Sequence, residues 1–436
     1  MAYNRPEPLS GKYEGSYAYL TIRDRMPVIL TKVIDGIHRK ATAYTKENNK
    51  EYAEDAKGLV SKLSELNYKM KTNKPLTNIE DKKNDVKLWN DILESVKVDG
   101  NDLAWYNGAW LTCETYLYRK IYEAFALSNY HQDCDPFKDQ KQASFILQKE
   151  NITSLANILL SGIGLLTKNS GSDDQTYSLF ETLLQFSLWG NKFDLSVFSG
   201  EILAQHSQLA SRLQNMKSKI LANDTPKAWA ALESQGNPRI DFILDNAGLE
   251  LFTDLCLAEF LLNSTNTSVV HLHIKDIPWF VSDTTEADIN WTLKQLQDSD
   301  IDFLSQLGHR WSKRISNGSF VVRKHLFWTL CHDFSQMKSV ANDLYNDLSK
   351  SKFLFFKGDL NYRKLVGDLN WPYTTPFSVA LCGFSPAPLC ALRTVKAEVV
   401  VGLEEGRAEQ AQSADTDWMI SGDYAVIQTS FYTNGQ

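Results

Sequence analysis

The spacing of apolar residues along the chain changes near its midpoint. Between residues 17 and 130, apolar residues recur every three or four positions, as in the run from Leu30 to Ile37, which is typical of amphipathic helices. Within and after this stretch, the clearest helices are predicted over residues 110–126, 151–166 and 177–189. From about residue 238 the pattern becomes one of short apolar runs separated by polar loops and helical segments. The first half is therefore predicted to be helical, and the second half to contain strands.

Short apolar runs in the second half predict the strands of a sheet. They cover residues 240–244, 268–274, 318–323, 353–356, 389–392 and 423–431. Helical segments separate them, and the clearest begin near Leu249, Glu286 and Met337. Strands that alternate with helices favour a mainly parallel sheet covered on both faces. The predicted fold class is α/β, with a helical N-terminal region packed on a three-layer α/β/α domain.

A run of turn-forming residues marks the predicted domain boundary. Residues 222–239 contain Asn, Asp, Gly, Pro and Ser, which favour turns and loops. We therefore divide the chain into a helical N-terminal region, residues 1–220, and an α/β/α catalytic domain, residues 221–436. Gly190 follows an apolar helix and is predicted to be its C-cap.

Charge and composition narrow the classes of partner. The 436 residues carry a net charge of −7, which gives no basic surface for nucleic acid. Residues 1–13 are polar and lack the apolar core of a secretory signal. The long uncharged runs, residues 151–167 and 369–392, contain polar residues or prolines, so no membrane span is expected. Six scattered cysteines without a Cys-x-x-Cys pair argue against zinc or a disulfide framework and favour a cytoplasmic or nuclear location.

The first candidate site follows the predicted strand 240–244. Asp245 and Asn246 end this strand, and Asp283 lies in a polar segment after the next one. In α/β sheets, ligands bind outside the carboxyl ends of the strands. Two carboxylates and an amide oxygen are hard ligands that suit a divalent ion. The alternative is that Asp245 is a turn residue and that Asp283 caps the following helix.

The second candidate site follows the apolar run 353–356. Gly358 permits close approach of the backbone to a ligand. Asp359 and Asn361 can hold hydroxyl groups, and the Arg363 guanidinium can bind a phosphate. The alternative is an ordinary strand-to-helix turn with a charged first turn.

Two smaller features remain open on residue type alone. Lys396, in the segment Arg-Thr-Val-Lys that begins at Arg393, has a compact charge that fits a phosphate, or it pairs with Glu398 at the surface. His271 and His273 alternate on a predicted strand, so they are either metal ligands or histidines with partners inside the sheet.

Taken together, these segments resemble one known family. The order LDNAGLELFTDL, WFVSDTT, FKGDLNYRKL and LRTVKAE is similar to the metal-dependent damage-control phosphatases. The Arg-Thr-x-Lys signature ending at Lys396 resembles subfamily III, the sugar-phosphate phosphatases, which also includes an acidic-residue (protein-glutamate) methyltransferase type. The segments SYAYLTIRDRMP and SLWGNKFDLS fit the same group, so the resemblance covers nearly the whole chain.

The resemblance implies a set of site residues. It implies that a divalent metal (Mn²⁺, Co²⁺, Ni²⁺ or Mg²⁺) is held by the catalytic residues Asp245, Asn246 and Asp283. The implied substrate-binding residues are Asp245, Asn246, Glu250, Asp359, Leu360, Asn361, Tyr362, Arg363 and Lys396.

The favoured function is metal-dependent hydrolysis of small sugar phosphomonoesters such as fructose 1-phosphate and fructose 6-phosphate. Lys396 and Arg363 would neutralise the phosphate, and either water or the Asp245 carboxylate would attack it. The alternative is transfer of a methyl group from S-adenosylmethionine to glutamate residues of a protein substrate. It ranks lower, because the sequence contains no glycine-rich strand-loop-helix for an adenosyl cofactor. A sugar-phosphate sensor without turnover is a third interpretation.

Overall fold

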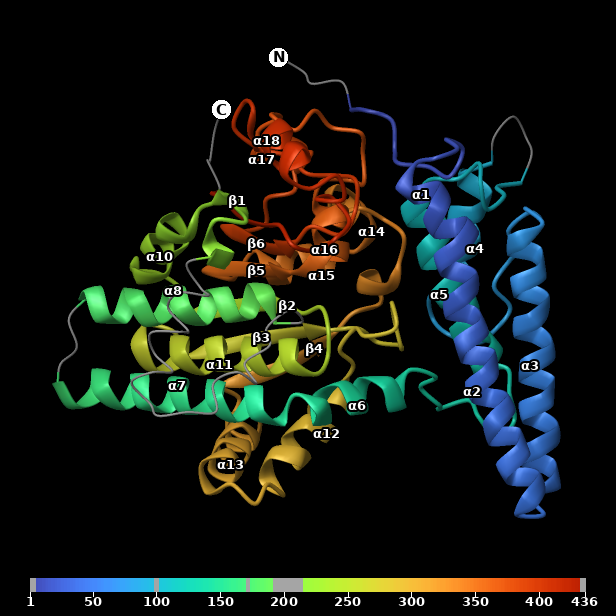
Figure 1. Ribbon diagram of the computed structural model, residues 1–436, viewed down its shortest axis with the longest axis horizontal. Helices are drawn as coiled ribbons and strands as arrows, with labels where there is room; N and C mark the ends of the chain where they lie inside the picture. Colours follow the sequence, from blue (N-terminus) through green and yellow to red (C-terminus); the bar gives the residue numbers. More distant parts are fainter. Residues whose placement is uncertain (1–4, 98–101, 170–172, 191–214, 432–436) are drawn as a thin grey trace.

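The computed structural model describes residues 5–97, 102–169, 173–190 and 215–431. Its first part is a helical region, residues 17–126, in which α2 and α3 form an antiparallel hairpin at one end of the molecule (Figure 1). The elements of this region are α1 (Tyr17–Leu20), the π-helical turn η1 (Thr21–Arg25), α2 (Met26–Lys46), α3 (Lys50–Lys71), α4 (Val86–Ser95) and α5 (Trp110–Ala126). The helix predicted over residues 110–126 is confirmed with the same bounds.

A seven-stranded sheet forms the centre of the rest of the chain, in the order β1-β7-β6-β5-β2-β3-β4. The strands are β1 (Ile220–Asn223), β2 (Arg239–Ile243), β3 (Val269–Ile274), β4 (Phe320–Lys324), β5 (Phe353–Lys357), β6 (Leu389–Thr394) and β7 (Ala425–Ser430). All neighbouring pairs are parallel except β6 and β7. The predicted α/β class and mainly parallel sheet are confirmed. The short strand β1 was not predicted.

One face of the sheet is covered by helices. α11 (Leu249–Ser264) is buried on nearly all sides, because it lies on the sheet and between α7 (Lys149–Asn169) and α8 (Asp173–Trp189) (Figure 1). α6 (Lys138–Leu147), α10 (Thr225–Glu233), α12 (Glu286–Gln297) and α13 (Asp302–Ser316) complete this side. Helices that precede residue 220 thus pack on the sheet, and the division at that residue stays a prediction.

The other face of the sheet shares one apolar core with the helical region. Ile243, Leu354 and Phe356 of the sheet belong to the same buried cluster as Leu30 and Leu63 of the α2–α3 hairpin. Further elements on this side are η3 (Leu326–Thr329), η4 (Phe334–Gln336), α14 (Met337–Val340), α15 (Asn342–Leu348), α16 (Gly358–Leu365), α17 (Phe377–Ala380) and α18 (Arg407–Ala414). Among the described helices, none has both the length and the apolar composition to cross a membrane.

Two sequence expectations concern the end of α8. Gly190 directly follows Trp189, the last residue of α8, as expected for a C-cap; a Cβ there would lie 2.9 Å from Glu250 Cα, so the small residue permits close approach to α11. Residues 191–196 of the segment SLWGNKFDLS are outside the described residues.

A buried ion cluster fixes α5 to the segment before α4. The Arg119 guanidinium donates from Nε to Asp85 Oδ2 at 2.9 Å and from Nη1 to Asp81 Oδ2 at 2.5 Å, and all three side chains are buried. Arg119 donates two hydrogen bonds to each carboxylate, because its Nη2 also bonds both Asp81 and Asp85. Such bidentate pairs fix the geometry of all three side chains.

We expect Arg119→Ala to destabilise the fold by about 3–5 kcal/mol, since it leaves two buried carboxylates unpaired. The control is Arg39→Ala, which removes an exposed ion pair with Asp35 on α2 and should cost less than about 1 kcal/mol. Urea denaturation of both variants measures the difference. Equal midpoints for the two variants would show that the Arg119 cluster does not stabilise the fold.

Candidate functional site

The site lies at the carboxyl edge of the sheet. β2, β3, β5 and β6 run parallel, so their carboxyl ends lie along the same edge. A polar residue or glycine follows each strand there: Asp245 after β2, Lys275 after β3, Gly358 after β5 and Lys396 after β6. Segments that are up to about 150 residues apart are thereby brought together, as expected for a sheet of this topology.

Backbone hydrogen bonds join the two acidic segments of the first candidate. Thr284 N donates to Asp245 O at 2.7 Å, and Ala247 N donates to Ser282 O at 2.7 Å. The Ser282 hydroxyl donates to Asn246 Oδ1. Just before it, Val281 has a φ of 71°, which is unfavourable for a β-branched residue. Strained backbone of this kind gathers at functional sites, and here it presents Ser282 to Asn246.

Asp245 and Asp283 are buried acids close to one another. Burial, together with the charges of Glu250 and Asp283, raises the pKa of Asp245 well above its usual range, while Lys275 and Lys396 oppose this shift. Burial raises the pKa of Asp283 to about 6, against the effect of Lys275, whose Nζ lies 3.2 Å from Asp283 Oδ2. The acids therefore need additional positive charge to be ionised together.

The donor set fits a divalent ion. Asp283 Oδ2 is buried without a hydrogen bond of good geometry among the described residues. The expected alternative for Asp283 does not hold, because the N-cap of α12 is Thr285, in a capping box with Asp288. Two carboxylates and the Asn246 amide are hard oxygen donors, and the buried Asp283 carboxylate, which pairs with Lys275 alone among the described ion pairs, can also face an ion of this type.

Glu250 and its neighbours form a second buried cluster behind the first. Asn246 Nδ2 donates to Asp245 Oδ2 at 2.7 Å and to Glu250 Oε2 at 2.8 Å, so Glu250 orients the amide. Lys357, the last residue of β5, lies 3.2 Å from both Glu250 Oε1 and Asp254 Oδ1. Burial raises the pKa of Asp254 to about 7, and Lys357 opposes the shift.

Gly358 is the point where the backbone of α16 meets Asp245. Its φ is 82°, and a Cβ at this position would overlap the Asp245 carboxylate. Only glycine combines the left-handed conformation with the space that this approach requires. The N-terminus of α16, with its free backbone N–H groups, therefore begins next to the buried acids.

The segment that ends β6 is attached to the start of α16. Asp359 Oδ1 accepts from Arg393 Nε at 2.8 Å and from Lys396 N at 3.1 Å. Lys396 is partly exposed, and among the described residues its ammonium forms no ion pair. Glu398, the expected surface partner, accepts from Tyr17 N at 2.7 Å. Lys396 and Glu398 form no ion pair among the described residues, and the charge of Lys396 lowers the pKa of Asp245.

The other predicted residues of α16 lie beneath the site. Asn361 Nδ2 donates to Lys357 O at 2.8 Å and, at 3.3 Å, to the carbonyl groups of Ile243 and Leu244. Tyr362 is buried and donates from its hydroxyl to Gln428 Oε1 at 2.8 Å. Leu360 is 5% exposed and belongs to the apolar core.

Arg363 is bound inside the protein. Its guanidinium donates to Asp368 from Nε at 2.8 Å and to Glu114 Oε2 from Nη1 at 2.6 Å, and it lies 3.6 Å from the centre of the Trp110 ring. Arg363 is buried and its charge is already shared by Glu114 and Asp368, so it has less charge to offer a phosphate than expected from the sequence. Lys396 and Arg363 are therefore not equivalent cations in this structure.

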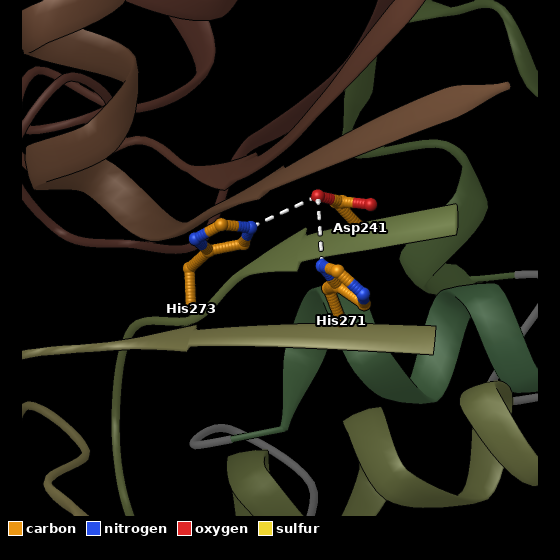
Figure 2. Close-up of side chains that lie close together, drawn as sticks. All are labelled: Asp241, His271 and His273. Atoms are coloured by element: carbon orange, nitrogen blue, oxygen red, sulfur yellow. Dashed lines mark hydrogen bonds and ion pairs between the residues drawn. The ribbon is translucent and has the colours of Figure 1, made fainter. Parts of the chain in front are cut away.

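A different group could also hold a divalent ion. Among the described residues, Asp241 of β2 and His271 and His273 of β3 present ligand atoms within 4.8 Å of one another, all of them buried (Figure 2). Burial lowers the pKa of His271 to about 4, so the imidazole is neutral and can act as a ligand. Of the two expectations for the histidines, His273 has a sheet partner, since its Nε2 lies 2.9 Å from Asp241 Oδ2.

The Asp241 carboxylate already has several partners. Arg239 donates to it from Nε at 2.7 Å and from Nη2 at 2.6 Å, and Ser351 donates from its hydroxyl at 2.8 Å. Burial opposes ionisation of Asp241, but the hydrogen bonds from His273 and Arg239 lower its pKa to about 2. An ion in this group would lie beside the Arg239 guanidinium, which already donates to Asp241. The cations that act on Asp245 are the lysines Lys275 and Lys396.

Comparison with known proteins decides the family. The model of the damage-control phosphatase ARMT1-like domain matches residues 21–411. The chain belongs to this family. Damage-control phosphatase ARMT1 of Xenopus tropicalis is 42% identical over 439 residues, covering 98% of this chain and 99% of the frog protein. Those of Mus musculus and Homo sapiens are 43% and 42% identical, each covering 97% of this chain and 98% of its own length.

A solved structure shows a weaker likeness. A DUF89 family protein from Pyrococcus horikoshii has 15% sequence identity and a TM-score of 0.39, and the match covers 78% of this chain and 87% of that chain. The relatives confirm the family resemblance of the sequence segments, and they place the ARMT1-like match over both the helical region and the sheet.

Sequence reasoning gave no role to several residues of this candidate site. Lys275 and Lys357 lie at the ends of correctly predicted strands, so the rule that identified Asp245 could also have assigned them to it. Asp241 and Asp254 could not be found in this way, because each lies inside a regular element and its partners are distant in sequence.

We expect Gly358→Ala to abolish phosphate release from a phosphomonoester, because the added methyl group displaces Asp245. Gly383→Ala is the matched control: its φ is 86°, but nothing lies within 4 Å of the added Cβ. Both variants should lose about 1–2 kcal/mol of stability from the left-handed backbone. Parallel activity and thermal-denaturation measurements separate the effects. Full activity in Gly358→Ala would show that the position of Asp245 does not matter.

Proposed function

We propose that this damage-control phosphatase hydrolyses sugar phosphomonoesters, with fructose 1-phosphate and fructose 6-phosphate as first candidates. One observation supports this most. The buried acids Asp245 and Asp283 lie at the same edge of the sheet as Lys396, whose charge lowers the pKa of Asp245. The acids can hold a divalent ion, and Lys396 is a cation that has no carboxylate partner among the described residues. Together these groups suit a dianionic phosphate.

Asp245, Asn246 and Asp283 are assigned to the divalent ion, which is Mn²⁺, Co²⁺, Ni²⁺ or Mg²⁺. When bound, the ion would polarise the phosphoryl group and offset the charge of the acids. Glu250 holds the Asn246 amide in place. The Asp241 group is assigned a supporting role, because Arg239 already neutralises its carboxylate.

The phosphate is neutralised by this chain's own residues. Lys396 supplies a full charge, and the N-terminus of α16 supplies backbone N–H donors. Asp359 fixes the backbone of Lys396 and, with 18% of its side chain exposed, can meet a sugar hydroxyl. Leu360, Asn361, Tyr362 and Arg363 anchor α16 to the protein interior. Either water attacks the phosphorus directly, or the Asp245 carboxylate attacks it, releases the sugar and forms an acyl phosphate that water then hydrolyses; the sugar oxygen takes up a proton, and both routes give inorganic phosphate and the free sugar.

The decisive experiment is a matrix of substrates and ions. Phosphate release is measured from a panel of sugar phosphates with Mn²⁺, Co²⁺, Ni²⁺ or Mg²⁺, beside transfer of a labelled methyl group from S-adenosylmethionine to protein glutamate. Ion-dependent phosphate release without methyl transfer supports the proposal. Methyl transfer without phosphate release from any sugar phosphate would overturn it, and binding without either reaction would indicate a sensor.

Removal of the ion should stop turnover. We expect a chelator to abolish phosphate release reversibly, and Asp283→Asn to weaken Mn²⁺ binding by more than the roughly 10–100-fold seen for residues that only support a ligand. Asp245→Ala and Asp283→Ala should be inactive but folded. Calorimetric titration with Mn²⁺ gives the affinity independently of activity.

The Asp241 group supplies the control for the ion assignment. His271→Gln should keep the Mn²⁺ affinity of the wild type, since His271 belongs to the other candidate group. If His271→Gln loses the ion while Asp283→Asn retains it, the catalytic ion belongs to Asp241, His271 and His273.

Lys396→Ala should lower kcat/KM by roughly a hundredfold or more, because the loss of a charge partner in a desolvated site commonly costs about 3–5 kcal/mol. Lys396→Arg should restore only part of the rate, since a planar fork occupies a different volume from an ammonium. The control is Lys324→Ala, which removes another lysine at the carboxyl end of a strand, paired with Glu286 at 2.8 Å. Near-normal kinetics of Lys396→Ala would exclude it from the site.

A further inference from the structure

Most cations around the site are already paired with acids. Lys275 lies 3.2 Å from Asp283, Lys357 lies 3.2 Å from Asp254, and Arg393 lies 2.8 Å from Asp359. Arg363 is shared by Glu114 and Asp368. These pairs balance the protein's own carboxylates, so they leave little positive charge for a substrate that brings nearly two negative charges. Besides Lys396, another cation is needed.

The helical region supplies such a cation, Arg25. It is the last residue of the π-helical turn η1, it is exposed, and among the described residues it forms no ion pair. Its guanidinium donates a long hydrogen bond, 3.4 Å from Nη1 to the hydroxyl of Tyr17. π-Helical turns are rare and are frequent at functional sites. Nearby Arg23, by contrast, is bound to Asp24 at 2.6 Å.

Arg25 faces a cleft that adjoins the candidate ion site. The cleft has a volume of about 680 Å³ and lies between η1 and α2 on one side and residues 280–282 on the other. Ser282, at its wall, is the residue whose hydroxyl donates to Asn246. The volume is in the range of sites for small organic ligands. Lys32, a second exposed cation in this cleft, lies two helical turns further along α2.

Tyr118 connects the charge of Arg25 with the acids. This buried tyrosine of α5 stacks on Phe280, with ring centres 4.5 Å apart. Burial and the charges of Glu114 and Asp283 raise the pKa of its hydroxyl, whereas the charge of Arg25 lowers it. Arg25 and Asp283 therefore act on the same phenol. α1, which leads into η1, is in turn bound to the Lys396 segment, because Tyr17 N donates to Glu398.

We propose that Arg25 is a substrate-binding residue that the helical region contributes to the site, where its guanidinium binds the phosphate of the sugar phosphate together with Lys396. The proposal rests on the proposed function. A guanidinium fork matches phosphate oxygens in two parallel hydrogen bonds, which the ammonium of Lys396 cannot do alone. In this arrangement substrate is held between the two halves of the chain, and the helical region takes part in recognition.

The test compares Arg25→Ala with Arg39→Ala in the full chain with Mn²⁺. Arg25→Ala should raise both the KM for fructose 1-phosphate and the Kd of inorganic phosphate by about tenfold or more, the size expected for a lost hydrogen bond to a charged group. kcat should change less than KM. Arg25→Lys should recover part of the affinity. Arg39→Ala should behave as the wild type, because neither Arg39 nor its partner Asp35 lines the cleft.

The two readouts separate this inference from the proposed function. Calorimetric binding of inorganic phosphate decides the role of Arg25 even if the wild type hydrolyses no sugar phosphate, in which case only the proposed function fails. If the wild type is an active phosphatase and Arg25→Ala retains its KM and phosphate affinity, the inference is wrong and the proposed function stands. A lower melting temperature of Arg25→Ala with unchanged phosphate affinity would assign Arg25 a structural role only.

Discussion

The burial of several carboxylates at one edge of the sheet is the constraint on which the site depends. Buried acids are costly unless they are paired or bound to metal. Here Lys275 and Asp283 pair within the segment that follows β3, and Lys357 at the end of β5 pairs with Asp254 of α11. Backbone hydrogen bonds from Thr284 to Asp245 and from Ala247 to Ser282 hold the segment after β3 against the end of β2. The charges of the site therefore depend on the same hydrogen-bonded ladder that builds the fold.

The fold was largely predictable from the sequence, because its strands are short apolar runs that end in polar residues. β2, β3 and β5 are buried along nearly their whole length, and each is followed by a turn with a distinct composition. β1 was missed, since a four-residue strand at the end of the sheet carries little apolar signal. α10, after it, begins with Thr225 and Pro226 inside a segment that was interpreted as a boundary.

The direction of side chains was less predictable than their position. Asp359 and Asn361 are two residues apart on α16, so they point to nearly opposite sides of the helix at about 100° per residue. Asp359 accordingly meets the Lys396 backbone, and Asn361 turns under the ends of β2 and β5. Arg363 is one turn from Asp359 on the same side, but its guanidinium is paired with Glu114 and Asp368. Sequence motifs identify such residues without showing which partners they already have.

The contacts of Arg363 have a consequence for how the two parts of this protein can vary. Its guanidinium lies between Glu114 and the Trp110 ring of α5 on one side and Asp368 on the other. The helical region also shares its apolar core with the sheet. A chimera that exchanged the first 126 residues with those of another protein would therefore have to carry a matching acid and aromatic ring, or leave the buried Arg363 guanidinium with Asp368 but without Glu114 and Trp110. The helical region and the sheet are therefore matched to one another at this guanidinium.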